Sequence, residues 1–159
     1  MDKNKNGAKV STKDNVYFVL KDKNGVIKKE WKGANLITNA GFAALASRLN
    51  GAGSEAAFTF IGIGTGTTAA NVSDTALESE ITTGGGSRAA ATASRVTTDV
   101  TNDTAQLVLT FNFTASFSVT ETGVLNAASS GTLLNRQVFT AVAVTSGDSL
   151  QITHKFDMD

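Results

Sequence analysis

The chain has 159 residues, the size of one domain with a single core, and its 14 basic and 14 acidic residues balance. This composition creates no net field to attract nucleic acid or an anionic membrane, so we expect a protein partner. The absence of cysteine excludes disulfides, cysteine-ligated zinc and thiol catalysis. No window reaches the roughly 18 apolar residues of a membrane span, and the N-terminus lacks the apolar core of a signal peptide.

The first segment, residues 1–14, mixes lysine, asparagine, aspartate and glycine without an apolar period, which is typical of a tail with no fold of its own. We interpret it as an extended N-terminal arm that lies on a neighbouring subunit. Residues 15–159 are then expected to form a single domain.

A hairpin is predicted next, because the β-rich runs 15–21 and 26–31 flank the turn-forming sequence Asp22-Lys23-Asn24-Gly25. Tyr17 and Trp31 lie in these runs and give the hairpin apolar residues on both faces. A hairpin of this kind needs a second surface, which is either the following helix or another chain.

A helix is predicted after Thr38 or Asn39, either of which can cap it, and Asn50-Gly51 is expected to end it. Its apolar residues at helical spacing are Phe42, Leu45, Ala46 and Leu49. A second, shorter helix is predicted up to Ile81, because Thr75 and Glu78 have the spacing of a capping box.

The remaining apolar runs predict β-strands, at 58–63, 87–100, 105–119, 133–144 and 149–158, with a short strand within 122–126. In the run 105–119 every second residue is apolar, while the opposite face is mostly threonine, asparagine and serine. These spacings predict a mainly β fold, an antiparallel β-sandwich of the Ig-like or jelly-roll-like kind, with one or two short helices and the N-terminal arm.

The glycine-rich sequence IGIGTGTT does not match a nucleotide-binding loop. A Rossmann fingerprint requires a third glycine where this chain has Thr67, and a Walker loop requires a lysine, which is absent between Lys32 and Lys155. We interpret the sequence as a glycine turn that leaves a strand.

His154 is the only histidine, and no cysteine is present to complete a metal site or a nucleophile around it. We therefore expect no catalytic residue, no metal and no cofactor. His154 is interpreted as a hydrogen-bonded residue at a strand end or at a subunit contact. Glu78 and Glu80 lie two residues apart on the predicted short helix and would point to different sides, unlike the carboxylate pair of a glycosidase.

Three arginines, Arg88, Arg95 and Arg136, lie in an otherwise charge-poor β region. Such arginines form fixed ion pairs, either within the chain or across a subunit boundary, and Glu78, Glu80 and Glu121 are the natural partners. Both alternatives stay open from the sequence. The residues considered for an interface are Tyr17, Trp31, Arg88, Arg95, Arg136 and His154.

Three segments resemble a group of small virion proteins of tailed bacteriophages: NLITNAGFAALASRLNG, FTFIGIGTGTTAANVSDTALESEI and TGVLNAASSGTLLNRQVFTAVAVTSGDSLQITHKFDM. Several members of this group are decoration or tail-fibre proteins. The resemblance extends from about Leu36 onward, and the hairpin 16–31 fits the same pattern. It implies a structural protein of the virion and carries over no catalytic residue.

From the residues and this resemblance together we expect a non-enzymatic capsid decoration or cement protein on the capsid exterior. Its expected partners are copies of itself, as a trimer, and the major capsid protein, with no nucleic acid and no membrane. The alternative is a tail-fibre, tail-tip or adaptor subunit that contacts tail proteins and possesses a receptor-contacting surface. A carbohydrate-binding module on the virion, centred on Trp31, is the alternative from another class. The chain would be made in the host cytoplasm.

Overall fold

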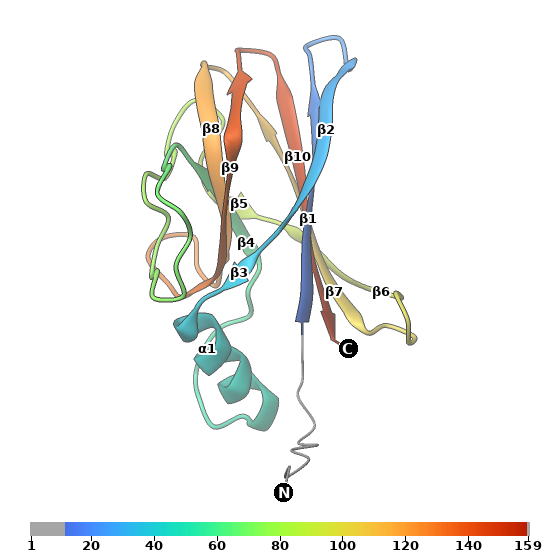
Figure 1. Cartoon of the computed structure of the whole chain (residues 1–159), viewed down its shortest axis with the longest axis vertical. Helices are drawn as coiled ribbons and strands as arrows, with labels where there is room; N and C mark the ends of the chain where they lie inside the picture. Colours follow the sequence, from blue (N-terminus) through green and yellow to red (C-terminus); the bar gives the residue numbers. More distant parts are fainter. Residues whose placement is uncertain (1–11, 159) are drawn as a thin grey trace, which may run out of the picture.

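Ten β-strands and one α-helix form residues 12–158, the part of the chain that this computed structural model describes (Figure 1). In chain order they are β1 Thr12–Lys21, β2 Ile27–Ala34, β3 Leu36–Ile37, α1 Asn39–Asn50, β4 Phe60–Gly64, β5 Ala89–Ala90, β6 Thr92–Val96, β7 Thr104–Asn112, β8 Phe117–Leu125, β9 Leu133–Val144 and β10 Ser149–Met158. The strands confirm the predicted antiparallel β-sandwich.

Two five-stranded antiparallel sheets form its layers. The first sheet has the order β2-β1-β10-β7-β6 and the second has the order β3-β9-β8-β4-β5. The first and last strands, β1 and β10, pair in the middle of the first sheet along their whole length. The chain changes sheets four times, between β2 and β3, β5 and β6, β7 and β8, and β9 and β10, so both sheets combine strands from distant parts of the sequence (Figure 1).

The predicted hairpin is confirmed as β1 and β2. Asp22 closes its turn, because the carboxylate accepts hydrogen bonds from the backbone amides of Asn24 and Val26 at 2.8 and 2.9 Å, and Gly25 supplies a φ of +80°. Strand β1 begins at Thr12, so the last three residues assigned to the N-terminal arm belong to the sheet. The rest of that predicted arm lies outside the described residues.

The predicted first helix is confirmed as α1, including both of its ends. Thr38 caps it by accepting a hydrogen bond from the Gly41 amide at 2.9 Å, and Gly51 ends it with a φ of +70°. The helix buries Gly41 and Ala44 against β9, however, and leaves Phe42 and Leu49 exposed. A side chain at position 41 would collide with the backbone of Leu134, so glycine lets the helix approach the sheet here.

The predicted second helix is wrong. Residues 73–81 lie in a long connection between β4 and β5 that contains turns and bends but no helix. The Glu78 carboxylate does not cap a helix; it accepts hydrogen bonds from the amide and hydroxyl of Thr68 at 2.8 and 2.7 Å. A tertiary contact therefore uses the side chain on which the capping prediction rested.

The predicted long strand 105–119 is also wrong, because it is two strands in different sheets. Strand β7 ends at Asn112 and β8 begins at Phe117. The alternation continues across the bend because Phe113 and Phe117 both pack against the core, with their ring centroids 6.1 Å apart. The predicted strand 87–100 is similarly interrupted at Ala91, between β5 and β6.

Candidate functional site

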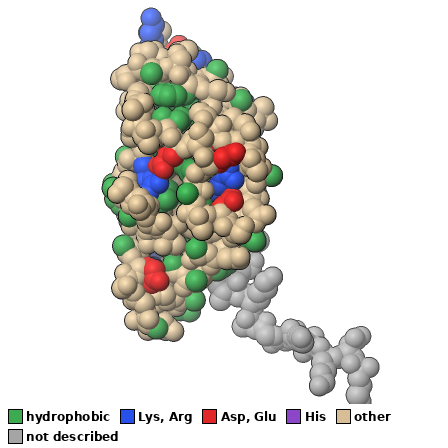
Figure 2. Space-filling view, turned by 90° about the vertical axis from the view of Figure 1, so that its left-hand side faces the viewer, with side chains coloured by type: hydrophobic (Ala, Val, Ile, Leu, Met, Phe, Trp, Pro, Cys, Tyr) green, Lys and Arg blue, Asp and Glu red, His purple; other side chains and the backbone are tan. Residues whose placement is uncertain are grey.

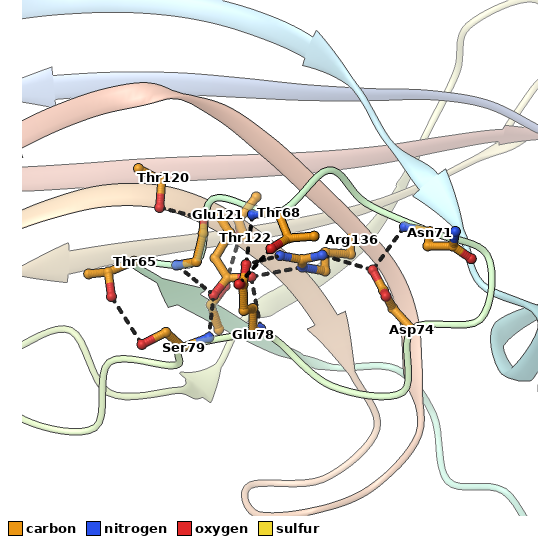
Figure 3. A network of polar contacts seen from close by, with 12 residues as sticks. Thr65, Thr68, Asn71, Asp74, Glu78, Ser79, Thr120, Glu121, Thr122 and Arg136 are labelled. Atoms are coloured by element: carbon orange, nitrogen blue, oxygen red, sulfur yellow. Dashed lines mark hydrogen bonds and ion pairs between the residues drawn. The ribbon is translucent and has the colours of Figure 1, made fainter.

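A network of ion pairs lies on the outer side of the second sheet, centred on Arg136 of β9 (Figure 3). The guanidinium donates from Nε to Glu121 at 2.8 Å, from Nη1 to Asp74 at 2.9 Å and from Nη2 to Glu78 at 3.2 Å. Glu121, on the neighbouring strand β8, is wholly buried. Arg136 thus joins Glu121 of the sheet to two carboxylates, Asp74 and Glu78, of the connection between β4 and β5.

The Glu121 carboxylate also receives three backbone amides of that connection. Gly66, Glu78 and Ser79 donate to it at 3.1, 3.0 and 2.8 Å. A Cβ atom at Gly66 would lie 2.6 Å from Glu121 Oε1, so the glycine-rich run allows this close approach. The amides that a bound phosphate would use are therefore occupied by a carboxylate of the chain itself.

Arg136, Asp74 and Glu78 are charged at neutral pH. Burial opposes the charge of Arg136, but its hydrogen bonds to Asp74 and Glu121 outweigh this effect and raise its pKa above the ordinary value. The pKa of Glu78 lies below its ordinary value, mainly because the Thr68 hydroxyl donates to it. The connection is accordingly fixed to the sheet by ionised groups.

A second ion pair joins Arg88 to Glu80. The two side chains form parallel hydrogen bonds, Nε to Oε1 at 2.7 Å and Nη2 to Oε2 at 2.6 Å. Nη1 of Arg88 also donates to the backbone oxygens of Ala127 and Ser130, which ties the loop between β8 and β9 to the connection. Figure 2 shows this side of the molecule, where basic and acidic side chains meet in small groups within a largely uncharged surface.

His154 lies wholly inside the sandwich, not at a surface. Its Nδ1 is 3.3 Å from the amide nitrogens of Asn35 and Asn135, and its Nε2 is 3.4 Å from the Thr122 hydroxyl. Because the Asn135 oxygen accepts from the Val124 amide, the Asn135 nitrogen faces the ring, so Nδ1 accepts and Nε2 carries the proton. Burial lowers the pKa of His154 to about 3, and the ring is neutral.

Trp31 and Tyr17 lie on opposite faces of the hairpin. The indole of Trp31 stacks on Phe18 with centroids 4.5 Å apart and contacts Phe139 of β9 at 5.8 Å. The hairpin therefore packs its Trp31 and Phe18 face against β9 of the same chain and not against the helix. Tyr17 is 38% exposed on the outer face of the first sheet, where the ammonium of Lys155 lies 5.4 Å from its ring.

The six residues considered for an interface thus separate into two groups. Arg88, Arg136 and His154 have internal hydrogen-bond partners and little or no exposed surface, which is the internal one of the two alternatives that the sequence left open. The sequence predicted Glu78, Glu80 and Glu121 as arginine partners correctly, but it missed Asp74. Tyr17 and Arg95 are exposed, and Trp31 is half-buried.

An apolar cleft of about 230 Å³ lies between α1 and the ends of the first-sheet strands β6, β7 and β10. Its apolar lining includes Leu45, Phe58, Leu107, Leu134, Phe156 and Met158. Among the described residues that line it, the only titratable one is Arg48, which donates to the backbone oxygen of Glu55. Its chemistry is suited to an apolar side chain.

Among the side chains that the structure describes, no group of three or more histidine, aspartate or glutamate residues is placed to hold a metal ion. The single helix of this part of the chain is too short to cross a membrane. Comparison of the chain with protein-family models, with curated proteins and with solved structures finds no match.

Proposed function

We propose that this protein is a non-enzymatic structural subunit of a tailed-phage virion, acting as a decoration or cement protein on the capsid exterior. The resemblance of residues 36–158 to small virion proteins supports this role. The observation that carries it is the internal pairing of charge on the second-sheet side. Arg88 and Arg136 are bound to four carboxylates of the same chain, so the charged groups are held in internal contacts and the surface around them is made largely of hydroxyl, amide and methyl groups. A surface whose few charges are already paired within the chain favours contact with protein.

The fixed connection between β4 and β5 suits this role energetically. A loop that is ordered only on binding reduces affinity by the entropy of its ordering, whereas a preformed loop does not. Glu121 and Arg136 hold this loop in place before any partner arrives. Each apolar Å² that the face buries on a capsid then contributes about 25 cal/mol, and many copies reinforce the shell.

The test is to tag the chain, purify intact particles and locate the tag by electron microscopy. Hundreds of copies on the shell support the proposed role, whereas a few to a few dozen copies on the tail support the alternative of a fibre, tip or adaptor subunit. Absence of the chain from particles overturns both.

A matched pair of variants tests the face. Ala76→Lys places a charge in the exposed part of the connection and is expected to reduce occupancy on particles at least tenfold. Thr110→Lys places the same charge on the exposed outer face of the first sheet and is expected to leave occupancy unchanged. Equal loss with both variants, or with neither, contradicts the assignment of the contact to the second-sheet side.

No contact of Trp31 favours the carbohydrate-binding alternative. Glycan-binding aromatic residues present a free ring face, but the indole of Trp31 is stacked on Phe18 and lies under the ammonium of Lys29, 5.0 Å from its centroid.

A further inference from the structure

The helix α1 exposes an apolar stripe that no described part of the chain covers. Phe42, Ala46 and Leu49 are spaced four and three residues apart and therefore lie on one side of the helix. Leu49 is 88% exposed and Phe42 is 53% exposed. Both are large side chains, and their exposure leaves a contiguous apolar surface in water.

The apolar cleft described above borders this stripe. Leu45 and Arg48 of the same helix line the cleft. They are adjacent in sequence to the stripe residues Ala46 and Leu49. Its other walls come from residues 57–59 and from β6, β7, β9 and β10. One end of the molecule therefore presents both protruding apolar side chains and a hollow that accepts apolar side chains.

A surface that carries both an apolar protrusion and an apolar hollow can complement itself, and self-complementarity is what a contact between two copies of one chain requires. The charges near the cleft do not oppose such contact, because Arg48 lies beside Glu55 and the two carry opposite signs. The chain as a whole also has no net charge, so two copies do not repel at long range.

We propose that copies of this protein associate through this end, with Leu49 and Phe42 of one copy seated in the apolar cleft of another. The contact can be reciprocal in a two-fold dimer or can run head to tail around a trimer, and both use the same two surfaces. This inference deepens the proposed function by naming the surface for self-association. It is tested in solution, so its failure is distinguishable from absence of the protein on particles.

The experiment measures the molar mass and dissociation constant of the full chain by analytical ultracentrifugation. Leu49→Ser removes the protrusion, and Ala57→Phe fills the cleft from an exposed lining position. Each is expected to raise the dissociation constant at least tenfold. The matched controls are Val26→Ser, at a 61% exposed apolar position on the hairpin tip, and Ala56→Phe, on an exposed neighbour that does not line the cleft. Both controls are expected to associate as the wild type does.

Mixing the two disabled variants gives the decisive readout. The Leu49→Ser chain keeps an open cleft and the Ala57→Phe chain keeps the protrusion, so the mixture should form complexes that neither variant forms alone. Circular dichroism checks that each variant is folded, and Ala93→Leu fills the same cleft from β6 if Ala57→Phe does not fold. The inference is overturned by a monomeric wild type at high concentration, by controls that weaken association equally, or by failure of the mixture to associate.

Discussion

Glu121 and Arg136 lie on neighbouring strands of the second sheet, with Arg136 Nε donating to Glu121 Oε2 at 2.8 Å and 0% and 3% of their side chains exposed. A buried ion pair of this kind is sensitive to loss of one partner, because the other charge is left without compensation in a poorly solvated place. The connection between β4 and β5 depends on the same pair, since three of its amides donate to Glu121.

Arg136→Met is expected to lower the free energy of unfolding by about 3–5 kcal/mol, because it leaves Glu121 buried and unpaired. Lys28→Met is the control: Lys28 pairs with Asp148 at 2.8 Å and is 39% exposed, and the 5% exposed Asp148 keeps hydrogen bonds from the amide and hydroxyl of Thr145, so the loss of Lys28 should cost only about 1 kcal/mol. Urea denaturation measures both. Equal effects would show that burial of the Arg136 pair is energetically unimportant.

The stability of the protein should fall as the pH drops from 7 to 5 because of His154. The unfolded chain protonates this histidine near its ordinary pKa of 6.5, whereas the folded chain keeps it neutral until about pH 3. The unfolded state therefore binds more protons across this window, and the free energy of unfolding falls by about 2 kcal/mol between pH 7 and pH 5. His154→Gln should flatten this part of the profile. An unchanged slope in the variant would assign the effect to other groups.

Gly41→Ala should destabilise the protein by about 1–3 kcal/mol, although alanine is the better helix former by about 1 kcal/mol. The reason is the collision of the new methyl group with the Leu134 backbone, which cannot move without disturbing β9. Ala43→Gly, at an exposed position of the same helix, isolates the propensity effect and should cost about 1 kcal/mol. Thermal unfolding compares the two, and a stabilised Gly41→Ala protein would contradict the close packing of α1 on the sheet.

Trp31→Leu should cost more stability than Tyr17→Leu. Trp31 loses contacts with Phe18 and Phe139, and aromatic contacts contribute about 0.5–1.5 kcal/mol each beyond buried area. Tyr17, on the opposite face of the same hairpin, contacts only the ammonium of Lys155 among the aromatic and cationic neighbours described. Guanidinium denaturation should therefore separate the variants by about 1 kcal/mol or more. A larger effect for Tyr17→Leu would show that the Tyr17 face of the hairpin, and not the Trp31 face, is the packed one.

Local chemistry made the hairpin and the helix α1 predictable from the sequence. The turn before Val26 needs only Asp22 and Gly25, and the helix ends need only Thr38 and Gly51, all of which act on nearby backbone. The apolar face of the helix was not predictable in the same way. Gly41, which carries no side chain, determines which side approaches the sheet.

The predictions of the second helix and of the long strand failed because contacts with residues distant in sequence outweigh the local pattern. The capping-box spacing of Thr75 and Glu78 is real, but Thr68 and Arg136 bind the Glu78 carboxylate instead. The alternating run 105–119 crosses between sheets without a break in period because both sheets face one core. Hydrophobic period reports the direction of side chains relative to the core and does not report which sheet a strand joins.

The candidate site was predictable in part for the same reason. Opposite charges in a charge-poor region must find one another, so Glu78, Glu80 and Glu121 could be named as arginine partners from composition. The role of Gly66 beside Glu121, and the pairing of His154 with Asn35 and Asn135, depend on which loops and strands meet in space. Residue spacing in the sequence does not predict those contacts.

The pairing of β1 with β10 determines how the molecule responds to force. Thr12 lies opposite Met158, so the described chain begins and ends at one end of the first sheet, beside each other (Figure 1). A pull applied at these two ends separates β1 from β10 one residue pair at a time, because the hydrogen bonds between the strands are loaded one after another. A force applied to the faces of the sheets is instead shared by many hydrogen bonds at once. The protein should therefore resist a force on its sheet faces better than a pull at the two ends of the described chain.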